Sequence, residues 1–119
     1  MSETKTYEGS CHCGKVRYTV ETDLGRVIEC NCSICRRTGT LLTFVPAAQF
    51  KLLSGGDAVQ DYQFNRHMIH HFFCTTCGVR SYCGAALPDG KDMRAINVRC
   101  LHGVDVKALT ITQYDGAAL

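Results

Sequence analysis

The cysteines of this chain constrain its fold more than any other residue type. Seven of the nine cysteines fall into three short clusters, Cys11-x-Cys13, Cys30-x-Cys32-x-x-Cys35 and Cys74-x-x-Cys77. Cysteines spaced this closely can turn their sulfurs toward one metal ion, but they rarely reach good disulfide geometry with each other. An odd number of cysteines also fits complete disulfide pairing poorly. The clusters therefore favour zinc sites over disulfide bonds.

The composition indicates a soluble globular protein. The chain has 119 residues, of which 45% are hydrophobic and 20% charged, so one domain spanning residues 1–119 is expected. No apolar run approaches the roughly 18 residues that a membrane helix needs, and residues 1–8 lack the hydrophobic stretch of a signal peptide. We therefore expect a cytoplasmic protein without membrane contact. In that reducing compartment, cysteine clusters indicate metal sites.

The charge argues against general attraction to nucleic acid. The formal net charge is +2, but seven thiolates add seven negative charges and two Zn²⁺ ions add four positive ones, which gives −1. Lysine and arginine are spread along the chain, and Arg36-Arg37 is the only adjacent basic pair. A nearly neutral protein favours small-molecule partners over nucleic acid or anionic membranes. Nothing in the sequence specifies an oligomeric interface.

Strand patterns dominate the sequence. Residues Lys15 to Glu21 alternate with a period of two, which places Val16, Tyr18 and Val20 on one face of a strand. Further strands are predicted over residues 41–45, 50–53, 58–64, 68–73, 79–83 and 93–99, and single turns of helix over 33–38 and 46–50. These short strands, joined by glycine-bearing turns, predict an all-β fold of small antiparallel sheets with minimal helix, stabilised by zinc.

Four cysteines are predicted to form a closed, structural zinc site, namely Cys11, Cys13, Cys74 and Cys77. Four thiolates complete the tetrahedral coordination of zinc. Cys74-Thr-Thr-Cys77 has the spacing of a zinc knuckle, and Gly78 permits the tight turn that follows it. This site would join the N-terminal strand to a hairpin about 60 residues later.

Cys30, Cys32 and Cys35 are predicted to form a second zinc site with an open position. All three lie within six residues, so one ion can bind them locally. The fourth ligand would be water, a substrate thiol, Cys83, Cys100 or a histidine. Water or a thiol would make a reactive site, whereas a protein ligand would make a second structural one. We favour the open arrangement, because catalytic zinc keeps a free position.

The remaining cysteines and histidines have simpler interpretations. Free cysteine is often buried, so a core position is favoured for Cys83 and Cys100. His67, His70 and His71 lie in one predicted strand, but no histidine ligand motif accompanies them. A polar strand face accounts for these three histidines.

Three sequence strings link the chain to a known family. They are Gly9-Ser-Cys-His-Cys-Gly14 with Val16-Arg17-Tyr18, Cys30-Asn-Cys-Ser-Ile-Cys-Arg-Arg-Thr-Gly39, and Phe73-Cys-Thr-Thr-Cys-Gly78. With them, the chain resembles a short, single-domain member of the glutathione-dependent formaldehyde-activating enzyme family, which also contains centromere protein V. The resemblance extends over about residues 9–105, with residues 97–101 resembling the C-terminal strand of the family. It implies a zinc-stabilised domain of the β-tent type with two zinc ions, of which the one at Cys30, Cys32 and Cys35 is open.

The resemblance also implies an activity. The family condenses formaldehyde with glutathione to S-hydroxymethylglutathione, formally the reverse of a carbon–sulfur lyase reaction, as an S-(hydroxymethyl)glutathione synthase does. The candidate catalytic residues are Cys30, Cys32, Cys35 and Arg36. A thiol that binds at the open position would lose its proton. Arg36 or Arg37 would clamp a glutathione carboxylate, or would simply occupy a solvated turn.

Two other classes of function remain open at this point. In the first, both zinc ions are structural and the surface binds a partner protein or nucleic acid, as the centromeric relative suggests. In the second, the exposed cluster is a thiol or metal sensor that releases zinc on mild oxidation.

Overall fold

The structure, a computed structural model, describes residues 3–64, 69–86 and 90–118, and it is nearly all-β, as predicted. The strands are β1 (Lys5–Ser10), β2 (Arg17–Thr22), β3 (Val27–Cys30), β4 (Leu42–Pro46), β5 (Phe50–Ser54), β6 (Val59–Tyr62), β7 (Ile69–Cys74), β8 (Tyr82–Ala86), β9 (Asp92–Asn97) and β10 (Ile111–Tyr114). One short helix, α1 (Cys35–Thr38), and four 3₁₀ turns, η1 (Ala47–Gln49), η2 (Val98–Cys100), η3 (Val106–Ala108) and η4 (Gly116–Ala118), complete the described chain. No helix in these ranges is long and apolar enough to cross a bilayer.

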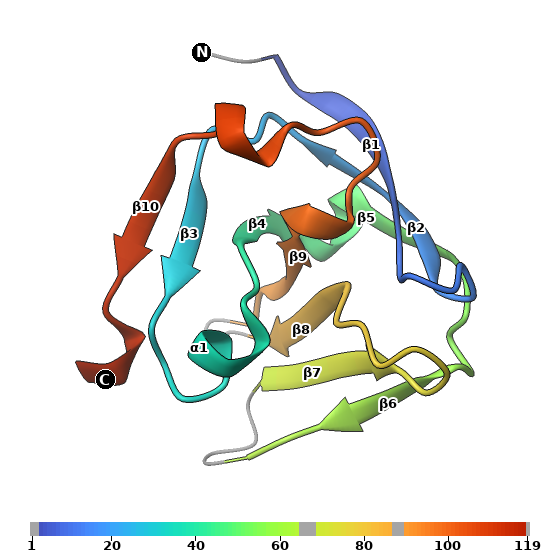
Figure 1. The fold of residues 1–119 in the computed structure, drawn as a ribbon. Helices are drawn as coiled ribbons and strands as arrows, with labels where there is room; N and C mark the ends of the chain where they lie inside the picture. Colours follow the sequence, from blue (N-terminus) through green and yellow to red (C-terminus); the bar gives the residue numbers. More distant parts are fainter. Residues whose placement is uncertain (1–2, 65–68, 87–89, 119) are drawn as a thin grey trace.

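The strands form two sheets, one small and one large. The small sheet has the order β1-β2-β5, and the large one the order β10-β3-β4-β9-β8-β7-β6. Figure 1 shows the large sheet running from β10 and β3 on one side of the molecule to β7 and β6 at the bottom. The prediction of antiparallel sheets fails at one place, because β10 pairs with β3 in parallel. A parallel pair needs a long connection, which the 80 residues from 31 to 110 supply here.

The core lies between the two sheets. Val16, Tyr18 and Val20 are buried on one face, as the period-two pattern predicts. The ring of Tyr18 lies 5.1 Å from that of Phe50 and 5.9 Å from that of Tyr82, measured between ring centroids. The Tyr18 hydroxyl donates a hydrogen bond to the backbone oxygen of Ser81 over 3.1 Å. This aromatic cluster joins the small sheet to the large one.

The other face of the large sheet carries a second, smaller core. Register places Phe44, Ala95, Cys83, His71 and Tyr62 in one row across β4, β9, β8, β7 and β6. Beside this row, Ile28, Leu42 and Ala95 form a buried cluster against which Cys35 and Cys83 pack. The start of α1 therefore lies on this face of the sheet, and with it the three-cysteine cluster.

Several element boundaries differ from the prediction. The strand expected over 79–83 begins at Tyr82, because the backbone of Val79 still bonds to the knuckle through Cys74 N–H. Residues 98–100 form η2 and not a strand, since the Asn97 side chain accepts from the backbone N–H of Arg99 and caps the turn. The strands β1, β3 and β10 were not predicted. Met68, the first residue of the strand predicted over 68–73, lies outside the described residues.

Candidate metal centres

The structure brings the four cysteines of the predicted closed site together from two distant loops. Cys11 and Cys13 lie between β1 and β2, Cys74 ends β7, and Cys77 lies in the turn that follows. Their four sulfurs all lie within 4.8 Å of one another, and the Cys11–Cys13 and Cys13–Cys74 Sγ separations are both 3.6 Å. A tetrahedral zinc ion with Zn–S bonds of about 2.3 Å places its sulfurs about 3.8 Å apart. The set therefore fits one zinc ion.

Backbone N–H groups point at these sulfurs, as a zinc knuckle requires. Val16 N–H donates to Cys11 Sγ over 3.4 Å, and Thr76 N–H donates to Cys74 Sγ over the same distance. Gly78 has a φ of 77°, which its lack of a Cβ permits, and its N–H bonds to the Cys74 oxygen over 2.8 Å. The backbone N–H groups of Cys77 and Thr76 lower the pKa of the Cys74 thiol and so favour the thiolate form that binds metal.

Cys77 shows the same effect in its titration. Burial raises the pKa of its thiol, but the backbone N–H groups of Cys13 and Val79 outweigh this and bring the pKa down to about 6. A thiol with such a pKa is largely ionised at neutral pH. Cys77 is therefore prepared for metal binding before the metal arrives.

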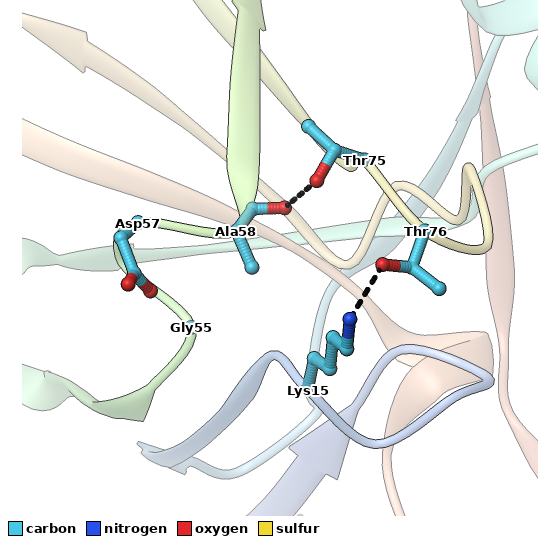
Figure 2. A pocket seen from close by; sticks show the side chains of 6 residues that line it. All are labelled: Lys15, Gly55, Asp57, Ala58, Thr75 and Thr76. Carbon is cyan, nitrogen blue, oxygen red and sulfur yellow. Dashed lines mark hydrogen bonds between the residues drawn. The ribbon is translucent and has the colours of Figure 1, made fainter.

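A shallow polar pocket lies beside this knuckle (Figure 2). Lys15 Nζ donates to Thr76 Oγ1 over 2.9 Å, and Thr75 Oγ1 donates to the Ala58 oxygen over 3.0 Å. Gly55 and Asp57 line its other side, and no cysteine contributes to its lining. These bonds tie the knuckle to the loop after Cys13 and to the start of β6, which agrees with a structural role for the site.

The three-cysteine cluster is local, as its spacing predicts. Cys30 ends β3, Cys32 lies in the following loop and Cys35 begins α1. Their sulfurs lie within 4.8 Å of one another and all three residues are half-buried. Among the described residues, no histidine, aspartate, glutamate or fourth cysteine joins this set. The donor set fits a zinc ion that keeps one open position.

Cys32 and Cys35 differ in the pKa of their thiols. Burial, together with the neighbouring thiols, raises the pKa of Cys35 to about 12. Burial also opposes ionisation of Cys32, but the backbone N–H groups of Cys35 and Ile34 and the adjacent thiols bring the pKa of Cys32 below its ordinary value. Cys32 is therefore more ready than Cys35 to bind a metal, and Cys35 would release its proton on binding.

Cys83 and Cys100 belong to neither sulfur set within the described residues. Burial raises the pKa of Cys83 to about 11, and its sulfur lies 3.7 Å from His71 Nδ1. Burial also raises the pKa of Cys100, whose sulfur lies 3.6 Å from Asn97 Nδ2. The structure thus gives neither cysteine a place as fourth ligand of the open site.

The polar strand face predicted for the histidines is only partly right. His71 is 7% exposed, because its strand position faces the second core and not solvent, and burial lowers its pKa. His70 takes the opposite face, and its Nδ1 lies 2.6 Å from a carboxylate oxygen of Asp61. His67 lies outside the described residues.

Arg36 and Arg37 have different surroundings although both are exposed. Arg37 Nη1 donates to the Ser33 oxygen over 2.8 Å and so belongs to the turn of α1. The guanidinium of Arg36 has no hydrogen bond or ion pair with any described residue. Of the two, only Arg37 has its guanidinium bonded to a described residue.

Sequence reasoning missed the residues that cover the three-cysteine cluster from the C-terminal side. There, Asn31 accepts a hydrogen bond from the backbone N–H of Ala117, and Gly116 lies against Cys30. Asn31 and Gly116 are 85 residues apart in the chain. The pair Asp115-Gly116 is a local turn signal, but no spacing rule connects it to Cys30.

The comparisons with known proteins identify the family of the chain. Residues 6–112 match the sequence model of the family described as glutathione-dependent formaldehyde-activating enzyme. The chain belongs to this family. Among solved structures, a crystal structure of a Rhodobacter sphaeroides protein matches with a TM-score of 0.77 and 28% sequence identity, over 88% of this chain and 99% of that one. The formaldehyde-activating family match covers all seven clustered cysteines.

Proposed function

We propose that this chain is a zinc-dependent enzyme of the carbon–sulfur lyase type, which joins formaldehyde or a similar small aldehyde to a thiol such as glutathione. One observation carries the proposal. In a chain of the formaldehyde-activating family, the sulfurs of Cys30, Cys32 and Cys35 gather with no fourth protein ligand among the described residues, while the other site has its full set of four. An incomplete set is typical of catalytic zinc.

In this proposal, Cys30, Cys32 and Cys35 hold the zinc ion. When bound, the ion supplies a positive charge that lowers the pKa of a thiol placed at the fourth position. The cysteines hold the ion against the small core of Ile28, Leu42 and Ala95, because Cys35 packs on these side chains. This apolar support excludes water from one side of the cluster and strengthens electrostatic interactions there.

The reaction itself is an addition without oxidation or reduction. The thiol sulfur forms a bond to the carbonyl carbon, and the carbon–oxygen π bond opens onto the oxygen. The proton released by the thiol ends on that oxygen, which gives a hydroxymethyl thioether. The chain has to deliver the thiol as thiolate and to hold the aldehyde beside it.

Arg36 is the proposed contact for a carboxylate of the thiol substrate. It follows Cys35 directly, it is exposed, and no described residue competes for its guanidinium. A guanidinium pairs with a carboxylate through two parallel hydrogen bonds, which fixes orientation as well as adding affinity. Replacement of Arg36 by Lys would keep the charge and lose this paired geometry.

The test follows adduct formation between formaldehyde and glutathione by NMR exchange spectroscopy, with zinc content measured on the same samples. Wild type and a Cys83→Ser control should carry two zinc ions per chain and should exceed the uncatalysed rate. Cys32→Ser should carry one zinc ion, keep its fold and give only the uncatalysed rate. Wild type with two zinc ions and no rate above background would refute the proposal and would favour a zinc-stabilised binding module.

A further inference from the structure

The segment that follows β10 is bonded to the loop between two of the clustered cysteines. Asn31 N–H donates to the Tyr114 oxygen over 3.2 Å, and Asn31 Nδ2 donates to Asp115 Oδ1 over 2.9 Å. In return, Ala117 N–H donates to Asn31 Oδ1 over 2.9 Å. The backbone donor and both side-chain polar atoms of Asn31 are thus used by one segment from the other end of the described chain.

The sheet determines where this segment lies. β10 pairs in parallel with β3, and the register places Tyr114 opposite Cys30. The residues after Tyr114 therefore continue alongside the loop that follows Cys30. Figure 1 shows this arrangement, with the chain end below β10 lying beside the turn that leads from β3 to α1.

Gly116 lies directly against the cluster. A Cβ built at this position would overlap the sulfur of Cys30 and would lie 3.2 Å from Cys32 Cβ. Glycine is required here by lack of space and not by backbone conformation, since Gly116 is absent from the residues with positive φ. A zinc ion would lie only about 2.3 Å from the Cys30 sulfur. Gly116 therefore belongs to the layer of atoms that directly surrounds the metal ligands.

We propose that residues 114–118, named here the strap, position the Cys30–Cys32 loop and wall off one side of the open coordination position. Asp115 and Gly116 are then positioning residues that control metal affinity at this site and the size of the thiol that can enter it. The inference rests on the proposed function only for the identity of that fourth ligand. The family match ends at residue 112, before the strap, so the match itself does not imply this role.

The strap acts through hydrogen bonds to a metal-bearing loop. Groups that hydrogen-bond to metal ligands usually change metal affinity by about tenfold to a hundredfold when they are removed. Asp115 bonds to the residue between two ligands, so we expect an effect at the lower end of this range. Loss of the Asp115 carboxylate leaves Asn31 Nδ2 without its acceptor and removes one of the three bonds that hold the loop. A methyl group at position 116 pushes either the strap or the Cys30 sulfur away. Both changes should weaken the three-cysteine site and leave the four-cysteine site unaffected.

The test uses the full chain loaded with cobalt(II), whose visible spectrum reports the number and geometry of thiolate ligands. Asp115→Ala should bind the second cobalt ion about tenfold more weakly than wild type, while the first ion binds unchanged. Asp115→Asn keeps an acceptor oxygen toward Asn31 and should restore wild-type affinity. Asp57→Ala is a matched control, because Asp57 is exposed, has no partner among the described residues and lies beside the other site.

A second measurement tests whether the strap limits the size of the thiol that enters the open coordination position. Mercaptoethanol and glutathione are titrated into the cobalt-loaded protein, and thiol binding is read from the change in the spectrum of the second site. A chain ending at Gln113 should gain affinity for glutathione relative to mercaptoethanol, whereas Gly116→Ala should lose affinity for both.

The outcomes separate this inference from the proposed function. If Asp115→Ala and Gly116→Ala bind cobalt and thiols with wild-type affinity, the proposed role of the strap is refuted. The same follows if Asp115→Asn is as weak as Asp115→Ala. Asp115→Ala and Gly116→Ala could weaken cobalt binding at the second site while wild type never exceeds the uncatalysed adduct rate. That result would support the proposed role of the strap and would refute only the proposed enzymatic activity.

Discussion

Replacement of Cys74 by serine should destabilise the protein far more than replacement of Cys35 by serine. Each change removes one ligand from one zinc site. The first site connects Cys13 with Cys74, which are 61 positions apart, whereas the second connects Cys30 with Cys35, which are only five apart. A metal that closes a long loop removes more conformational freedom from the unfolded chain than one that closes a short loop.

The magnitude follows from the two separations. The loop-closure entropy grows as three-halves of RT times the logarithm of loop length, so the ratio of 61 to 5 gives about 2 kcal/mol in favour of the long connection. Zinc binding at a structural site contributes about 10–16 kcal/mol. The net stability of a whole domain is about 5–15 kcal/mol. Cys74→Ser should therefore unfold without denaturant or nearly so, and Cys35→Ser should stay folded.

The assay is urea unfolding followed by far-UV circular dichroism, with excess zinc and again with a chelator. Cys74 is 1% exposed and also packs in the core, so serine there costs stability even without metal. The zinc-dependent part of each midpoint separates the metal contribution from this packing loss. Equal zinc-dependent losses for Cys74→Ser and Cys35→Ser would refute the reasoning, as would a Cys74→Ser protein that stays folded with a single zinc ion.

Three further predictions concern single side chains. Tyr18→Phe should lower the free energy of unfolding by about 1 kcal/mol, measured in urea, because the bond to the Ser81 oxygen is lost while the ring stays packed. Burial lowers the pKa of His71, so the stability that depends on its neutral form is fully present above pH 6.5 and falls as pH drops below that value. Unfolding midpoints of His71→Gln should accordingly change less than those of wild type between pH 7 and pH 5. Burial raises the pKa of Cys83 to about 11, so iodoacetamide at pH 8 should label it at least about tenfold more slowly in the folded protein than in urea, as read by mass spectrometry.

The sequence alone was sufficient wherever the relevant residues are neighbours in the chain. The alternation of Val16, Tyr18 and Val20 predicted a buried strand face, and the structure confirms it. The spacing of Cys30, Cys32 and Cys35 predicted three sulfurs near one ion, and the turn from β3 into α1 brings them within 4.8 Å of one another. Knuckle turns and short strands are likewise set by local backbone geometry.

The histidines show that the sequence pattern of one strand does not determine which of its side chains are buried. A polar face was expected for the strand that carries His71, yet this side chain is buried beside Cys83. The pattern of one strand does not say whether its second face is covered. That depends on the neighbouring strand β8 and on the row of side chains that register builds across the sheet.

The family membership, the all-β character and the two cysteine groups that could hold metal ions were thus readable from the sequence, since each follows from residue types and short motifs. The tertiary structure alone decided that β10 runs parallel to β3 and that Gly116 lies against Cys30. Each of these contacts joins residues more than 60 positions apart, or strands separated by 80 residues of connecting chain. The path of the chain through both sheets determines such contacts, and no local spacing encodes that path.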